Sequence, residues 1–215
     1  MGTDRDIAIN EDGVRVLNTL REYLEWRQES FQILGAKMST HQLKHRDKTF
    51  VFYKGMDDIL LRKGMEYQKA ARPKGMKQGL PKHCFWNVLK YLKLKTKGYI
   101  YVEGYVVIKQ IPIPIHHAWL TTVKNPTVAY DPTLDYEPHE VEYLGIPFKT
   151  DYVIDINRRS GNKYASVLDA WWTNFELYSK SKEEIDELID ARGMKIVAAP
   201  VDNHTETCDD EVVSA

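Results

Sequence analysis

The chain has 215 residues, of which 43% are hydrophobic and 11% aromatic. This length and apolar content are sufficient for one domain with a sizeable core, with or without extensions. The 30 basic and 31 acidic side chains give a formal net charge of −1, which excludes a global field that would recruit nucleic acid or an anionic membrane surface.

The sequence predicts a soluble cytoplasmic protein. No stretch approaches the roughly 20 apolar residues that a membrane span needs. The first residues, Met1 to Asp6, lack the apolar region of a signal peptide and the Ser or Thr that myristoylation requires. Only two cysteines occur. Because they lie far apart and no secretory signal precedes them, a functional Cys84 and an incidental Cys208 are favoured over a disulfide between them, which stays formally possible.

The N-terminal third is predicted to be mainly helical. Apolar residues recur at three- and four-residue steps over residues 14–34, which predicts a long amphipathic helix. A short strand is expected at 49–53, followed by a second helix at 56–71 that Gly64 interrupts. The basic, Gly- and Pro-rich segment 69–82 is interpreted as a solvated loop, with a substrate-binding loop as the alternative.

From residue 83 the pattern changes to one helix followed by a meander of strands. The helix is expected at 83–94 and the strands at 99–109, 117–123, 127–130 and 152–156. Two helices follow, at 165–178 and from Ser181 to Gly193, the second opening with a Ser181/Glu184 capping box. A last strand is expected at 194–199. This order predicts an α+β fold in which a helix packs on an antiparallel sheet.

The most informative residue is Cys84, which is predicted to lie in the first turn of its helix. There the unpaired backbone N–H groups and the positive end of the helix dipole favour a thiolate. His117 and Asp131 follow near the ends of adjacent predicted strands, where their side chains can hydrogen-bond. A thiol, an imidazole and a carboxylate are the nucleophile, its base and the group that orients the base. The sequence therefore predicts a Cys84–His117–Asp131 triad.

Each of these residues also has an ordinary structural interpretation, as a core cysteine, a hydrogen-bonded histidine or a turn-forming aspartate. His116 is an alternative base, although strand alternation sends His116 and His117 to opposite faces. Glu103 is an alternative carboxylate that belongs either to the site or to an exposed face. Trp119 either shields the His–Asp contact from water or belongs to the core, and the core interpretation is favoured.

The combined motifs resemble the transglutaminase-like branch of the papain-like cysteine enzymes, in which Cys, His and Asp form the triad. They also resemble a group of uncharacterised phage and bacterial proteins. The similarity covers about residues 78–148, and its His-Ala-Trp element selects His117 as the base. The motifs are Cys84-Phe85-Trp86-Asn87, Tyr101-Val102-Glu103-Gly104, His117-Ala118-Trp119, Asp131-Pro132-Thr133 and Tyr143-Leu144-Gly145-Ile146-Pro147-Phe148.

The resemblance implies a papain-like or transglutaminase-like catalytic core at 76–157. An N-terminal helical extension would occupy 1–75, a C-terminal helical pair and strand 158–200, and an acidic disordered tail 201–215, together forming one compact domain. The implied activity is that of a cysteine hydrolase (protease, amidase or deamidase) or an acyltransferase, acting on an amide or acyl carbonyl through an acyl-enzyme. The expected partner is a protein, peptide or other amide-containing substrate, without a cofactor, nucleic acid or membrane; the sequence does not set the oligomeric state.

Four further residues complete the implied site. Gln78, six residues before Cys84, corresponds to an oxyanion donor that acts with the Cys84 backbone N–H, with a solvated loop residue as the alternative. Asn87 lies one helical turn after Cys84 and is assigned to substrate binding, with a helix-surface amide as the alternative. Glu103 and Trp119 complete the expected substrate-binding group.

Three other classes of function compete with this prediction. Cysteine, histidine and aspartate are also zinc ligands, but the adjacent His83-Cys84 and His116-His117 pairs do not have the usual ligand spacing. A non-catalytic binding, inhibitory or particle-associated protein of phage type is the second alternative, with a partner surface on the N-terminal helix and Trp171-Trp172. Residues 90–97 carry four lysines and Tyr91, interpreted as a solvated helix end rather than a nucleic-acid site.

Overall fold

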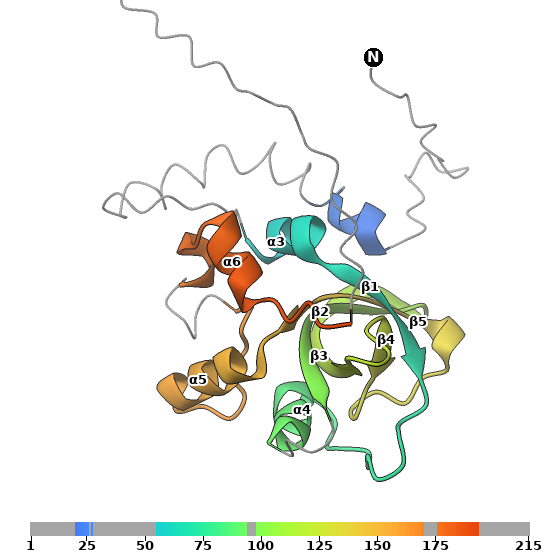
Figure 1. Cartoon of the computed structure of the whole chain (residues 1–215). Helices are drawn as coiled ribbons and strands as arrows, with labels where there is room; N and C mark the ends of the chain where they lie inside the picture. Colours follow the sequence, from blue (N-terminus) through green and yellow to red (C-terminus); the bar gives the residue numbers. More distant parts are fainter. Residues whose placement is uncertain (1–19, 26, 28–54, 94–97, 170–175, 194–215) are drawn as a thin grey trace, which may run out of the picture.

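The fold is described from a computed structural model, in which residues 20–25, 27, 55–93, 98–169 and 176–193 are described. Within these ranges five strands form a closed β-barrel, and helices lie around its outside (Figure 1). Residues 20–25 and 27 are helical. The other elements are α3 (Met56–Lys63), β1 (Met65–Ala70), α4 (Cys84–Leu92), β2 (Tyr99–Ile108), β3 (Ile111–Thr122), β4 (Val128–Tyr130), η2 (Pro138–Glu140), β5 (Val141–Phe148), α5 (Thr150–Ser160), η3 (Leu177–Ser179) and α6 (Lys182–Leu188).

The barrel closes because β1 pairs on both of its edges. The strand order is β1-β4-β3-β2-β5, and β1 runs parallel to β4 and antiparallel to β5. The long pairings of β2 with β3 and with β5 are antiparallel. By contrast, β3 and β4 are in register at a single pair, Leu120 with Tyr130. The chain therefore leaves the barrel wall directly after Tyr130, at Asp131.

Strand alternation divides the apolar side chains into two clusters. The first fills the barrel interior. The second lies between the outer face of the barrel and the surrounding helices, including Val88 and Leu89 of α4 and Ile59 and Leu60 of α3. The interior cluster consists of Tyr67, Val102, Val106, Ile108, Trp119, Ala129, Val141 and Tyr143.

The expected fold class is wrong. The protein is not a papain-like or transglutaminase-like helix on an open antiparallel sheet with helical N- and C-terminal extensions, because its strands close into a barrel. The physical reason is that two strands were not predicted, namely β1, which the pattern assigns to the helix at 56–71, and β5, where the pattern predicts no strand. The helix α3 instead ends at Gly64, which is extended with φ −71° and ψ 145°. Beyond it, Tyr67 points into the barrel while Glu66 and Gln68 are exposed, which is the alternation of a strand.

A second wrong assignment is the strand expected at 152–156, which lies in α5. Val153 and Ile156, three residues apart, are the buried positions of this helix. Asp155 pairs with both arginines of the last turn, and Gly161 ends the helix with φ 63°. Further on, α6 has the expected capping box but ends at Leu188 rather than Gly193, and residues 165–169 are not helical. The helix expected at 83–94 and the strands at 99–109, 117–123 and 127–130 are confirmed, with ends that agree to within two residues except the start of β3, which lies six residues earlier than expected.

Several expectations concern residues outside the described part of the chain. These are the strands at 49–53 and 194–199, most of the N-terminal helix, the pair Trp171-Trp172, Cys208 and the acidic tail. Among the residues that the structure describes, no helix is long and apolar enough to cross a membrane.

Candidate active site

Cys84 is the first residue of α4, and the chain reaches it through a tight turn. Lys82 has φ 63°, and the Pro81 carbonyl oxygen lies 2.7 Å from Nδ1 of His83, the N-cap residue. Because Cys84 opens the helix, its backbone N–H has no partner one turn earlier in the helix. The apolar face of α4 packs on the outside of the barrel and fixes this helix start. The Cys84 side chain is a buried free thiol, with 8% of the residue exposed.

His117 and Asp131 meet at the place where β3 and β4 separate. Nε2 of His117 lies 2.8 Å from Oδ2 of Asp131, and both residues are buried. The Cys84 thiol also contributes to raising the pKa of His117, which places the thiol near the imidazole. Because Asp131 engages Nε2, Nδ1 is the ring nitrogen left for the thiol. The structure thus brings together the three residues of the expected triad.

Asp131 is held by four hydrogen bonds. Oδ1 accepts from the backbone N–H groups of Thr133 at 2.7 Å and Leu134 at 3.1 Å. Oδ2 accepts from His117 and from the Tyr143 hydroxyl, each at 2.8 Å. The Asx turn that Asp-Pro-Thr favours therefore coexists with the contact to His117, since each function uses a different carboxylate oxygen.

The electrostatics of this pair favour the ionised forms. Burial opposes protonation of His117, but the charge and hydrogen bond of Asp131, together with the interaction with Cys84, raise the pKa of His117 to about 10. Burial likewise opposes ionisation of Asp131, yet His117 and the two backbone N–H groups hold the pKa of Asp131 below its usual value. Both shifts describe a carboxylate paired with an imidazolium.

The loop before Cys84 is fastened to the segment that follows Asp131. The Gly79 N–H donates to the Pro132 carbonyl oxygen at 2.6 Å. The buried Asn87 amide donates to the Leu80 carbonyl oxygen at 2.8 Å and to the Thr133 hydroxyl at 3.0 Å, and it accepts from the Leu80 N–H at 3.2 Å. Asn87, expected to bind substrate, therefore acts as a buried cross-link between α4, this loop and the Asp131 turn.

Gly79 is the tightest point of this cross-link, because an added Cβ would lie 2.2 Å from Cγ of Asn87. We expect Gly79→Ala to lower the free energy of unfolding by about 1–3 kcal/mol, as for other overpacked sites. Chemical denaturation of the parent chain, Gly79→Ala, Asn87→Ala and the double variant gives the four free energies of unfolding that a double-mutant cycle needs. If the clash is with Asn87, the Gly79 substitution costs much less in the Asn87→Ala background; additive costs would contradict this account.

Two other expected site residues, Gln78 and Trp119, form no hydrogen bond with the triad. Gln78 has an exposed side chain, and no hydrogen bond links it to another described residue. Trp119 is fully buried inside the barrel, where its ring stacks near His117 at 6.3 Å and its indole N–H has no partner among the described residues. It is a core residue that forms the wall behind His117.

Glu103 and His116 form a second acid–histidine pair on the outer face of the barrel. Oε1 of Glu103 lies 2.8 Å from Nε2 of His116, whose ring also lies near the rings of Phe85 and Tyr105. The fully buried Glu103 also accepts hydrogen bonds from the side chains of Tyr101 and Ser166 and from the backbone N–H groups of residues 167 and 168. Burial opposes its ionisation, but His116, Ser166 and Tyr101 hold the pKa of Glu103 below its usual value. Glu103 therefore anchors the segment 166–168 to β2.

Sequence reasoning missed three residues that support the site, namely Tyr143, Thr133 and Ser166. The first two stand inside the quoted motifs, at the start of Tyr-Leu-Gly-Ile-Pro-Phe and at the end of Asp-Pro-Thr, so their motif membership was the available signal. Ser166 had no such signal, because its contact with Glu103 joins residues 63 positions apart.

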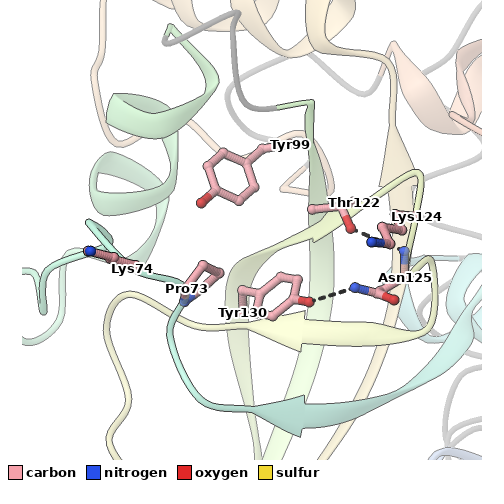
Figure 2. A pocket seen from close by; sticks show the side chains of 7 residues that line it. All are labelled: Pro73, Lys74, Tyr99, Thr122, Lys124, Asn125 and Tyr130. Atoms are coloured by element: carbon pink, nitrogen blue, oxygen red, sulfur yellow. Dashed lines mark hydrogen bonds between the residues drawn. The ribbon is translucent and has the colours of Figure 1, made fainter.

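Two of the hollows on the described surface are not lined by Cys84, His117 or Asp131. Figure 2 shows the smaller, of about 370 Å³, where Tyr99, Tyr130 and Pro73 line the space and the Asn125 amide donates to the Tyr130 hydroxyl at 3.0 Å. The larger, of about 760 Å³, lies beside α5 and residues 189–192. The lining residues of the smaller hollow are Pro73, Lys74, Tyr99, Thr122, Lys124, Asn125 and Tyr130.

No three His, Cys, Asp or Glu side chains among the described residues are grouped so that they could hold a metal ion. No protein-family model, curated protein or solved structure matches this chain.

Proposed function

We propose that the chain is a cysteine-dependent hydrolase or acyltransferase that acts on an amide or acyl carbonyl. The observation that carries the proposal is the buried His117–Asp131 pair beside the Cys84 thiol at the start of α4. A positioned histidine with an orienting carboxylate is what activates a thiol nucleophile. The motif resemblance to transglutaminase-like cysteine enzymes adds to the proposal.

In the proposed mechanism the Cys84 thiolate attacks the carbonyl carbon, and the π electrons of the carbonyl move onto its oxygen. The Cys84 backbone N–H stabilises this oxyanion, with Gln78 as the proposed second donor. His117 gives its proton to the leaving amine as the C–N bond breaks, which leaves a thioester. Water or an amine then attacks the thioester while neutral His117 takes the incoming proton, and the thiolate is released. Asp131 keeps the imidazole oriented throughout.

A free thiol with no disulfide partner among the described residues suits a reducing compartment, so we propose that the reaction takes place in the cytoplasm.

The second candidate function is a non-catalytic binding or particle-associated protein. The observation that favours it is the low exposure of the site, because Cys84 is only 8% exposed.

Thiol labelling distinguishes the two candidates. Iodoacetamide labelling between about pH 6 and 7, followed by peptide mass analysis, is expected to modify Cys84 at least about tenfold faster than an ordinary thiol, with a Cys-containing peptide as the reference. His117→Ala is expected to abolish this advantage. His116→Ala is the matched control, since it removes the neighbouring histidine on the opposite face of β3 and should leave the Cys84 rate unchanged.

His117→Gln, which retains a polar side chain, is the second variant if His117→Ala fails to fold. An ordinary Cys84 rate in the parent chain, or an unchanged rate after the loss of His117, would show that Cys84 is not an activated nucleophile. A biological effect that survives Cys84→Ala intact would favour the binding function instead.

A further inference from the structure

The part of the chain that carries Cys84 has an unusual charge. Between Tyr67 and Val102 there are eight lysines, one arginine and no Asp or Glu, although the whole chain has a formal net charge of −1. The rest of the chain is therefore strongly acidic. This basic segment contains the loop that leads to Cys84 and the whole of α4, which lies outside the barrel (Figure 1).

Two lysines of this segment, together with Lys163 from elsewhere in the chain, surround Trp86, two residues after Cys84. The ammonium groups of Lys90, Lys93 and Lys163 lie 5.4, 5.8 and 5.2 Å from the centre of the Trp86 ring. We call these four residues the Trp86 cluster. Lys90 and Lys93 belong to α4 or its end, whereas Lys163 comes from the loop that follows α5.

The loop that supplies Lys163 is held in place on both sides. The Tyr164 ring lies 5.2 Å from the ring of His83, the residue before Cys84. A few residues later Ser166 hydrogen-bonds to the buried Glu103. The Trp86 cluster is therefore built from two elements that are fixed to each other beside the start of α4.

None of the three lysines of the cluster forms an ion pair with a carboxylate among the described residues, whereas Arg72 and Lys63 pair with Asp135 and Asp186. Attraction to the indole ring offsets part of the repulsion between three like charges. A carboxylate from another molecule would relieve the rest. The arrangement is thus one that a negatively charged partner would complete.

We propose that the Trp86 cluster binds an acidic polypeptide segment, so that the substrate of the Cys84 site is an acidic protein or peptide. This inference rests on the proposed function and names its substrate class. A polypeptide is favoured over nucleic acid because the indole ring of Trp86 already carries lysine ammonium groups and does not stand free for base stacking.

Binding is measured with Cys84→Ala protein, so that the result does not depend on catalysis. A fluorescent poly-L-glutamate of about 20 residues and a single-stranded oligouridylate of equal charge are titrated by fluorescence anisotropy at about 50 mM salt, where charge contacts are only partly screened. The test variant is Lys90→Glu/Lys93→Glu/Lys163→Glu. The matched control is Lys109→Glu/Lys149→Glu/Lys182→Glu, which makes the same change of charge at three exposed lysines elsewhere.

We expect poly-glutamate to bind the Cys84→Ala protein and to bind the test variant at least about tenfold more weakly, while the control loses less than about threefold. Equal losses of poly-glutamate affinity in the two variants would show that binding depends on the overall charge and not on the Trp86 cluster, which would overturn the proposal. Absence of poly-glutamate binding, or tighter and cluster-dependent binding of oligouridylate, would also overturn it. These outcomes leave the Cys84 labelling result untouched, so a failed substrate class and a failed enzyme hypothesis are distinguishable.

Discussion

Replacing Asp131 with alanine is expected to lower the free energy of unfolding by about 3–5 kcal/mol, the usual cost of removing one partner from a buried ion pair. The substitution leaves several buried groups without a hydrogen-bond partner. His117 loses the acceptor of its Nε2, the Tyr143 hydroxyl loses its partner, and the Thr133 and Leu134 N–H groups lose theirs. Urea denaturation at pH 6 to 7 measures the change in free energy and in midpoint.

The pH dependence of stability identifies the ion pair as the cause. The pKa of His117 is raised to about 10 in the folded chain, against about 6.5 for an unperturbed histidine. The stabilisation from its protonated form is therefore complete below about pH 6.5, declines as the pH rises, and is lost near pH 10. The lowered pKa of Asp131 adds stability that is present above about pH 4 and is lost as the pH falls through its folded value. Asp131→Ala should lack both contributions.

Asp135→Ala is the matched control for this substitution. Asp135 lies four residues further along the same loop, its side chain is 62% exposed, and it pairs with Arg72. An exposed pair of this kind is worth up to about 1 kcal/mol, so the control should remain close to the parent chain. If Asp131→Ala loses no more than Asp135→Ala, the His117–Asp131 pair is not the stabilising element that its burial indicates.

The meeting of Cys84, His117 and Asp131 could be anticipated because each residue carries a local signal. A helix start marks Cys84, strand alternation separates His117 from His116, and a turn after a short strand marks Asp131. The roles of Asn87 and Glu103 could not be read in this way. Both are defined by hydrogen bonds to residues distant in sequence, Asn87 to Thr133 and Glu103 to the segment 166–168. Only the folded chain brings those partners together.

The barrel was not predicted because two of its strands, β1 and β5, were missed. With β1 interpreted as part of a helix and no strand predicted at 141–148, the strands predicted at 99–109, 117–123 and 127–130 suffice only for an open antiparallel sheet with free edges. The partners of β1 are β4 and β5, which follow it by about 60 to 80 residues in the registers Gln68–Val128 and Tyr67–Tyr143. A local pattern of six residues carries no information about such pairings, since strand preference depends on the neighbours that a strand finds.

The second large effect is expected at Glu103, where alanine should lower the free energy of unfolding by about 3–5 kcal/mol. The carboxylate is fully buried and accepts hydrogen bonds from the Tyr101 and Ser166 hydroxyls and from the Val167 and Leu168 N–H groups, besides pairing with His116. Exchange of the Val167 and Leu168 amide hydrogens, followed by NMR, should accelerate well beyond that of amides in β2. Glu66→Ala, at a carboxylate 77% exposed on β1, is the matched control and should leave stability nearly unchanged.

Glu103→Gln separates the charge of this carboxylate from its shape. The pKa of Glu103 is lowered in the folded chain, so its ionised form adds stability above about pH 4.3 that is lost as the pH falls through the folded value. The difference in stability between the parent chain and Glu103→Gln should therefore shrink in acid, whereas a purely steric effect would give the same difference at every pH.

Because Glu103 also anchors the loop that supplies Lys163, Glu103→Ala should weaken poly-glutamate binding although it changes no residue of the Trp86 cluster. Unchanged binding in that variant would show that Lys163 keeps its place without the Glu103 anchor.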